Sequence, residues 1–359
     1  MKPGAFSDPA LARKLVGAIG EATEALGGAA VMEVCGTHTM AIYRAGLAAM
    51  LPPALRLISG PGCPVCVTTN AEIDRAVALA RRPEVLVATF GDMVRVPGSD
   101  GSLEAARAEG GSVAVVYSPA DTIDLARANP DKTVVFVAVG FETTAPGVAA
   151  TVLSAREAGV ANLRFLVMHK TVPPALLALL DGGAAVDGFI LPAHVSTVIG
   201  LEPYRPIPER YGVAAAVAGF EPLDILAGIL SILRQKLAGK PTVDNTYRRV
   251  ARDCGNPLAR AVMEEVFSAC DARWRGLGTI RGSGLELRDE FAPFDARAIE
   301  VVLPPERESP GCMCGDVVAG RVNPAACPLF ASECTPGSPV GPCMVSSEGT
   351  CAAWYKYNR

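Results

Sequence analysis

Between residue 29 and about residue 220 the chain repeats one unit, in which a short apolar run leads through a turn into an Ala- and Leu-rich segment. Continuous apolar runs that alternate with helical segments are typical of parallel strands buried on both faces of a sheet. The sequence therefore predicts an α/β fold with two similar parallel-sheet domains that face a cleft. The strand-like runs are 30–34, 55–59, 85–90, 113–117, 133–139, 163–168, 187–192 and 212–218.

This pattern divides the chain into a first α/β domain at residues 1–118 and a second at residues 119–245. A weak internal echo supports two halves, because "VATFGDMVRVPG" at 87–98 resembles "VAVGFETTAPG" at 137–147. The alternative is that turns between strands and helices generally look alike. Residues 246–359 begin with helical and strand-like sequence and end in a tail rich in Pro, Gly and Cys. Such a tail buries little core of its own, so a stabilising cross-link or metal is expected in this third, cysteine-rich domain.

Polar residues concentrate in the turns that follow the apolar runs. In open parallel sheets, ligands bind at the carboxyl ends of the strands. Two sheets that present these turns to each other would form one cleft, which is the predicted functional site. All three histidines of the chain, His38, His169 and His194, lie in this set. The turns are "CGTHT" (35–39), "GPGCPVC" (60–66), "FGDM" (90–93), "GFETT" (140–144), "MHKT" (168–171), "PAHVS" (192–196) and "GFEPLD" (219–224).

Charge and composition exclude several classes of partner. The formal net charge is −4 and aromatic residues make up 6% of the chain. A nucleic-acid surface or an anionic membrane as main partner is therefore not expected. The opening "MKPGAFSDPALARKL" has no long apolar segment of the kind found in secretory signals, and no apolar stretch reaches membrane-spanning length. We expect a cytoplasmic protein.

Eleven cysteines in a cytoplasmic protein require an explanation, because structural disulfides are disfavoured in a reducing compartment. Four well-placed thiolates can hold a [4Fe–4S] cluster or a zinc ion. Long, irregular spacings favour the cluster, although six candidates for four places leave zinc, or neither, open. The six cysteines near the end of the chain are Cys312, Cys314, Cys327, Cys334, Cys343 and Cys351.

The pair Cys63 and Cys66 lies in a turn between a strand and a helix that is predicted to start near Thr69 or Asn70. A helix start favours reactive thiolates. Cys35 and His38 follow the preceding strand, and sequential strands often lie side by side. Three thiols and an imidazole would then converge at one sheet edge, where they suit iron, zinc or copper(I). The alternative is that these are inert buried cysteines.

Glu142, Thr143 and Thr144 follow another strand, where two interpretations remain open. They either cap the next helix, since Thr at a helix start satisfies free amides, or they face the cleft. Cys254 and Cys270 are interpreted as ordinary buried positions within helical sequence, because free cysteine behaves as a small apolar residue.

Six motifs in order resemble the HypD family of hydrogenase maturation factors. The resemblance spans residues 30–355. The motifs are "MEVCGTHT", "GPGCPVC", "GFETTAPG", "PAHVSTVIG", "GFEPLD" and the tail that ends in "GPCMVSSEGTCAA".

The resemblance implies a protein that helps build the Fe(CN)₂CO unit of [NiFe]-hydrogenases. In complex with the small chaperone HypC, such proteins form a scaffold on which iron receives its diatomic ligands. HypE delivers cyanide after loading through HypF, and the finished unit passes to the hydrogenase large-subunit precursor. The implied fold is two α/β domains that face a cleft, with a third domain that holds a [4Fe–4S] cluster.

The resemblance also assigns residues. The family's cluster spacing, C-x14-C-x6-C-x16-C, is matched by Cys312, Cys327, Cys334 and Cys351, which leaves Cys314 and Cys343 over. The family's functional thiols correspond to Cys35, Cys63 and Cys66, which are predicted to bind iron. We expect Cys35 to be the principal iron ligand, with His38 and Glu142 beside it and Thr143, Thr144 and His194 completing the site.

Two other functions remain open at this point. One is a dithiol oxidoreductase like ferredoxin–thioredoxin reductase, in which a cluster reduces the Cys63–Cys66 pair for a protein substrate. The other is a zinc-bound interaction module without redox chemistry. The favoured prediction is a redox-active assembly scaffold rather than a conventional turnover enzyme, with electrons passing from the cluster to the cysteine pair.

Overall fold

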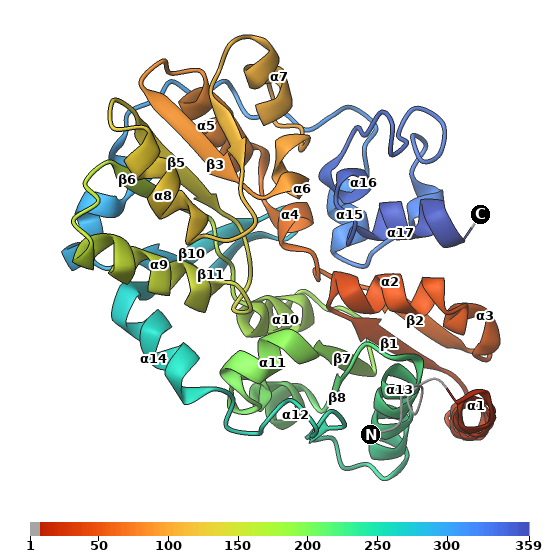
Figure 1. Cartoon of the computed structure of the whole chain (residues 1–359). Helices are drawn as coiled ribbons and strands as arrows, with labels where there is room; N and C mark the ends of the chain where they lie inside the picture. The colour runs from red at the N-terminus through yellow and green to blue at the C-terminus, as the bar shows by residue number, and fades with distance from the viewer. Residues whose placement is uncertain (1–7, 359) are drawn as a thin grey trace.

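The structure is a computed structural model that describes residues 8–358. Two parallel β-sheets, an antiparallel hairpin and a C-terminal group of short helices make up the described chain (Figure 1). This confirms the predicted α/β class with a separate cysteine-rich region at the end.

The first sheet has five parallel strands in the order β2-β1-β7-β8-β9. Strands β7 and β8 are buried along their whole length, as their uninterrupted apolar sequences predict. The strands are β1 (Ala29–Glu33), β2 (Leu55–Ser59), β7 (Gly188–Pro192), β8 (Ala214–Ala218) and β9 (Val243–Asn245).

The second sheet has four parallel strands in the order β4-β3-β5-β6. They are β3 (Val85–Thr89), β4 (Val113–Val115), β5 (Thr133–Ala138) and β6 (Leu163–Val167). The echo between 87–98 and 137–147 falls on β3 and β5, which are paired neighbours within this one sheet. It therefore does not relate one sheet to the other.

The composition of the sheets corrects the expectation of two consecutive halves, 1–118 and 119–245. The first sheet combines β1 and β2 with β7, β8 and β9, and the whole second sheet is inserted between β2 and β7. The join is direct, since β1 pairs with β7 from Val31 opposite Gly188 to Glu33 opposite Ile190. The chain thus leaves the first sheet, builds the second, and returns to the first.

Helices cover the sheets on both sides. The outer face of the first sheet packs against α1 and α13, where residues such as Ile19 and Ile225 form one apolar cluster. The described α-helices are α1 (Pro9–Ala25), α2 (Gly36–Arg44), α3 (Leu47–Met50), α4 (Pro64–Val67), α5 (Asn70–Ala80), α6 (Gly91–Val94), α7 (Leu103–Ala108), α8 (Asp121–Ala128), α9 (Ala145–Glu157), α10 (Val172–Asp181), α11 (Ala193–Ile199), α12 (Pro206–Tyr211), α13 (Pro222–Leu237), α14 (Pro257–Val266), α15 (Cys314–Val318), α16 (Pro342–Val345) and α17 (Thr350–Tyr357).

The region after α13 departs in detail from its predicted structure. Helix α14 ends at Val266, and β10 (Phe267–Trp274) pairs with β11 (Gly278–Leu287) as an antiparallel hairpin. Cys270 is therefore on a strand and only partly buried, and Cys254 is exposed in a loop. The interpretation of both as buried helical positions was wrong, because the apolar period did not reveal where helix gives way to strand.

The C-terminal helices return to the first sheet. Figure 1 shows α15, α16 and α17 next to α2 and α4, and the contacts confirm that α17 packs on α2 while α15 and α16 pack on α4. This arrangement places the cysteine-rich tail beside the turns that carry Cys35, Cys63 and Cys66. Across the described chain, no helix combines the length and the apolar character that a membrane crossing requires.

Candidate functional site

A cavity of about 360 Å³ lies between the two sheets, at the carboxyl ends of their strands. Its walls come from the turns after β1, β2 and β7, from the turns after β3 and β5, and from the C-terminal segment. Five of the seven predicted turns therefore face one another, whereas the turns at 168–171 and 219–224 contribute no residue to the cavity wall. A larger groove of about 1030 Å³ lies over α5 and residues 297–305, but none of the predicted site residues lines it.

Cys35 lines the cavity and stands at the N-cap of α2. Its backbone N–H donates to Glu33 Oε2 at 3.1 Å, and Glu33 Oε1 accepts from the hydroxyl of Thr39 at 2.5 Å. Burial, and after it the charge of Glu348, raises the pKa of the Cys35 thiol to about 12. An unligated Cys35 is therefore protonated at neutral pH, and a bound metal cation would favour its thiolate form.

Two glycines let three segments meet at Cys35. A Cβ on Gly62 would lie 2.3 Å from the backbone nitrogen of Cys35, so the turn after β2 presses directly on the turn after β1. A Cβ on Gly36 would lie 2.4 Å from the carbonyl oxygen of Glu348. The carboxylate of Glu348 in turn accepts from the Thr37 hydroxyl at 2.6 Å. The C-terminal segment is thus a wall of the same cavity.

The two predicted site histidines occupy different places. His38 is fully buried, and its Nε2 lies 3.0 Å from the carbonyl oxygens of both Ala218 and Gly219. Burial lowers the pKa of His38 to about 4, so the ring is neutral and ties α2 to the turn after β8. His194 is exposed and lines the cavity. His194, and not His38, is placed to meet a ligand in the cavity.

The "GFETT" turn also separates its residues. Thr143 and Thr144 line the cavity, and the Thr144 hydroxyl lies 3.1 Å from Nε2 of His169 instead of capping α9. Glu142 is buried away from the cavity and its Oε1 accepts the backbone N–H of Val172 at 2.9 Å, while Oε2 has no hydrogen-bond partner. Thr143 and Thr144 thus line the cleft, whereas Glu142 does not.

Raising the pH should destabilise the protein through Glu142. Burial raises the pKa of Glu142 from 4.5 to about 7, so the folded chain holds this proton more tightly than the unfolded chain. The contribution to stability is fully present below pH 4.5 and is lost as the pH rises through 7.

Glu142→Gln keeps an acceptor for Val172 N–H but cannot ionise. Between about pH 4.5 and pH 8, we expect its unfolding free energy to gain roughly 3 kcal/mol relative to wild type. Denaturant titrations at several pH values measure this difference. The matched control is Glu21→Gln on the exposed face of α1. If the unfolding free energy of Glu142→Gln relative to wild type changes with pH as little as that of Glu21→Gln, the raised pKa of Glu142 is contradicted.

Cys63 and Cys66 do not line the main cavity but a small neighbouring one, together with Cys343 and Glu348. Cys63 is the N-cap of α4, and its sulfur accepts the N–H of Cys66 at 3.2 Å and donates to Ser346 Oγ at 3.3 Å. Both side chains are almost completely buried, at 5% and 1% exposure. The prediction that three thiols and an imidazole converge at one place was therefore wrong. Cys35 lines the main cavity, and Cys63 and Cys66 line the neighbouring small one.

Cys343, one of the two cysteines left over by the spacing, connects the pair to the tail. The pKa of the Cys66 thiol is raised by burial and then by hydrogen bonds with Cys343 and Cys63. The pKa of Cys314 is raised first by its hydrogen bond with Cys343 and then by burial. The N–H of Cys351 donates to the Cys343 sulfur at 3.2 Å. Cys343 thus lines both the small cavity of the pair and the cavity of the C-terminal cysteines.

The tail offers a site for an iron–sulfur cluster. Within residues 8–358, no group of three or more His, Cys, Asp or Glu side chains is placed to hold a metal ion. All six C-terminal cysteines nevertheless line one small cavity, whose other walls include Leu329, Phe330 and Met344. Thiolate donors in an apolar enclosure suit a [4Fe–4S] cluster. The four cysteines with the family spacing, Cys312, Cys327, Cys334 and Cys351, share this cavity with Cys314 and Cys343, so enough thiols for such a group are present.

Three acidic residues lie in the cavity wall or hydrogen-bond to it; Asp92 belongs to the predicted "FGDM" turn, and Glu348 and Glu33 were missed. Asp92 lines it and accepts hydrogen bonds from the hydroxyls of Ser346 and Ser347, both at 3.4 Å. Glu348 reaches it from the far end of the chain, and no local pattern marked it. The buried carboxyl of Glu33, whose pKa burial raises to about 7, precedes Cys35 by two residues and its place in "MEVCGTHT" was the available signal.

Comparisons with known proteins give a consistent result. The family model HypD, described as the hydrogenase formation hypA family, matches residues 10–358. The hydrogenase expression/formation protein HupD of Azotobacter chroococcum mcd 1 is 45% identical over 99% of this chain and 96% of its own length.

Two further relatives are hydrogenase maturation factors named HypD. That of Escherichia coli K12 is 46% identical over 92% of this chain and 89% of its own length. That of Rhodobacter capsulatus is 44% identical over 98% of this chain and 97% of its own length. The similarity thus includes the α/β sheets and the cysteine-rich tail alike.

Proposed function

This chain belongs to the HypD family of hydrogenase maturation factors, and from that premise we propose that it is the scaffold on which an Fe(CN)₂CO unit is assembled. In this proposal the HypC chaperone docks at the cavity between the sheets, HypE donates cyanide, and the finished unit passes to the hydrogenase large-subunit precursor. The proposal places these events in the cytoplasm, where the eleven cysteines remain reduced.

The observation that carries the proposal is the arrangement of sulfur around the cavity. Cys35 stands in the cavity wall, and the buried pair Cys63–Cys66 lies between that wall and the C-terminal cysteines. Iron that carries cyanide and CO is a soft acceptor for which thiolate is a suitable ligand. Cys35 would hold the iron cargo, and the pair would exchange electrons behind it.

The residues of the tail support the electron supply. Cys312, Cys327, Cys334 and Cys351 would hold a [4Fe–4S] cluster, which when bound supplies electrons one at a time. Reduction of a Cys63–Cys66 disulfide to the dithiol takes up two electrons, one at a time, from the bound cluster and two protons from the solvent. The thiol of Cys63 donates to Ser346, whose hydroxyl donates to Asp92 in the main cavity, and this chain is a path for one of these protons.

Around the cargo, polar groups line the cavity. His194, Thr143 and Thr144 come from two different sheets and all reach the cavity. The ring N–H of His194 and the hydroxyl of Thr143 suit the nitrogen end of a cyanide ligand, which accepts hydrogen bonds. His38 and Glu142, which do not reach the cavity, would act by fixing α2 and α10 in place.

Iron counting on the purified complex with HypC tests the proposal. A scaffold should carry iron beyond the roughly four atoms of one cluster per chain when HypC is present, and only the cluster iron when it is absent. Elemental analysis with Mössbauer spectroscopy measures both. Cluster iron alone in both samples would sink the scaffold function.

The alternative dithiol oxidoreductase is less well supported. A pair that reduces a protein substrate must present a thiolate at the surface. Cys63 and Cys66 are 5% and 1% exposed, and Ser346 and Pro342 of the C-terminal segment cover them. To reduce a disulfide of another protein, the pair would need this cover to open. Thiol–disulfide exchange with Cys343 would not need it, because Cys343 lines the same small cavity.

A further inference from the structure

Arg275 is a buried cation directly behind the helix that carries the cysteine pair. It follows β10 in the turn of the hairpin, and its side chain is 2% exposed. Its neighbour Gly276 has a positive φ of +76°, and a Cβ there would lie 2.1 Å from the carbonyl oxygen of Gly315. The hairpin turn is therefore wedged against α15, with Arg275 directed toward α4.

Arg275 satisfies the end of α4, a four-residue helix whose last carbonyls have no helical donor. Its backbone N–H donates to Val67 O at 2.8 Å. Its Nε and Nη2 donate to Thr68 O at 3.2 and 2.8 Å, and Nη2 also donates to Asn70 Oδ1 at 2.8 Å. Arg275 thus fixes the junction between α4 and α5. The first residue that it contacts there, Val67, follows Cys63 by four positions.

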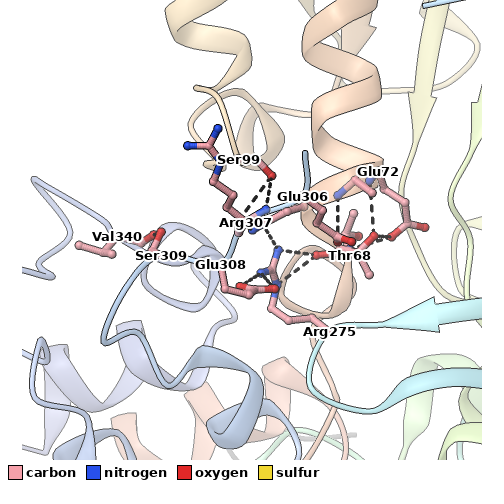
Figure 2. Close-up of polar contacts among 12 residues, drawn as sticks. Thr68, Glu72, Ser99, Arg275, Glu306, Arg307, Glu308, Ser309 and Val340 are labelled. Atoms are coloured by element: carbon pink, nitrogen blue, oxygen red, sulfur yellow. Dashed lines mark hydrogen bonds and ion pairs between the residues drawn. The ribbon is translucent and has the colours of Figure 1, made fainter. Parts of the chain in front are cut away.

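The same guanidinium holds the strap, defined here as residues 299–309. Nη1 donates to both carboxylate oxygens of Glu308, at 3.1 and 2.8 Å (Figure 2). The Asn70 side chain donates in turn to the carbonyl of Arg307, which also accepts from Ser99 at 3.5 Å. The strap ends three residues before Cys312, the first predicted cluster ligand.

We propose that Arg275 is a positioning residue that fixes the Cys63–Cys66 helix against the strap and thereby sets the thiol–disulfide equilibrium of the pair. The inference rests on the redox role proposed for Cys63 and Cys66. A bidentate guanidinium suits this place, because its planar fork can meet a carboxylate on one side and two carbonyl-type acceptors on the other.

The direction of the effect follows from the contact within α4. The sulfur of Cys63 accepts the N–H of Cys66, and a hydrogen bond of this kind favours the reduced pair, in which the sulfur carries more negative charge. When Arg275 is replaced by Met, Thr68 O at the end of α4 loses its two guanidinium donors, whereas the backbone N–H to Val67 O remains, so the helix is held less tightly. The reduced form then loses part of its stabilisation, and the disulfide becomes relatively more stable.

The test measures this equilibrium in the isolated full-length protein. Reduced dithiothreitol passes two electrons and two protons to a Cys63–Cys66 disulfide and becomes the cyclic disulfide. After alkylation and trypsin digestion, the peptide of residues 57–75 reports the pair, because it holds these two cysteines and no other. We expect Arg275→Met to shift the equilibrium toward the disulfide by about tenfold, which corresponds to roughly 30 mV.

Two variants make the result interpretable. Arg273→Met is the matched control, because Arg273 pairs with Glu306 of the same strap but does not touch α4, and it should leave the equilibrium within about twofold of wild type. Arg275→Lys keeps the charge and loses the fork, and it should shift the equilibrium in the same direction as Arg275→Met but by less. If Arg275→Met fails to fold, the thiol–disulfide equilibrium of Arg275→Lys alone tests the inference. A wild-type equilibrium in the folded Arg275 variants overturns the inference.

A second readout does not depend on redox cycling. The alkylation rate of the reduced, buried pair reports how often α4 opens, and it should rise at least about tenfold in Arg275→Met but not in Arg273→Met. An unchanged alkylation rate in Arg275→Met contradicts the proposal that Arg275 holds α4 in place. If the scaffold function is wrong, the HypC complex will hold no iron beyond the cluster. That result would leave the thiol–disulfide equilibrium and the alkylation rate of the pair unaffected.

Discussion

Replacing Cys35 with Ala should abolish the cyanide and CO infrared bands of the purified complex with HypC. Among residues 8–358, Cys35 is the one cysteine that lines the main cavity, and it stands there at the N-cap of α2, where Glu33 accepts its backbone N–H. Without its sulfur the cavity presents oxygen and nitrogen donors, which are poorer ligands for a soft, low-spin iron. Infrared spectra of matched wild-type and Cys35→Ala complexes measure the effect.

Two variants separate ligand chemistry from shape. Cys35→Ser retains the size of the side chain but offers a hard hydroxyl, so it should also lose the bands. Cys270→Ser removes a partly buried thiol on β10 and should retain them. Bands of wild-type intensity in Cys35→Ala would rule out Cys35 as the principal iron ligand and would direct attention to the buried pair.

The strands could be read from the sequence, but their membership of the sheets could not. Runs such as 133–139 and 187–192 are apolar throughout, and both are buried strands in the structure. Nothing local states that β1 takes β7 as its neighbour, because that pairing depends on where the chain returns after building a whole second sheet. An apolar run specifies burial on two faces, and the order of strands is decided by packing at a distance.

The site shows the same division between local and distant information. The turns could be placed at one cleft, since strand ends of parallel sheets share an edge. The orientation of His38 could not, because its ring is held by the carbonyls of Ala218 and Gly219, about 180 residues away in the chain. Glu348 contacts Thr37 across a separation of 311 residues. Residues brought in by the tail were therefore beyond the reach of the motif itself.

Cys343 shows why the spacing of the tail was an incomplete guide. The family spacing selects four cysteines for the cluster and leaves Cys314 and Cys343 without a place. In the structure both line the cavity of the tail, and Cys343 also lines the small cavity that contains Cys66. The cysteine pair in "GPGCPVC" therefore has Cys343 of the tail as a neighbour. The pair is separate from Cys35 because Cys63 and Cys66, at the start of α4, line the small cavity and not the main one.

Replacing Cys351 with Ala should remove the cluster and with it the brown colour and absorption at about 400 nm. Cys351 lies at the start of α17 and lines the cavity that the other C-terminal cysteines share. With one of four thiolates missing, we expect anaerobically purified protein to hold less than about one iron per chain instead of about four. Absorption spectra and iron analysis on the same samples measure this loss.

The loss should extend beyond the tail itself. Residues 319–341 contain little regular structure, so a bound cluster would supply much of the cohesion of the tail. Helix α17 packs on α2, and Glu348 forms part of the main cavity wall, so hydrogen exchange should increase in both places in Cys351→Ala. Cys254→Ser, at an exposed position far from the tail in the chain, should retain the full spectrum and wild-type exchange. A cluster of undiminished intensity in Cys351→Ala would mean that Cys343 or Cys314, which line the same cavity, is the ligand in its place.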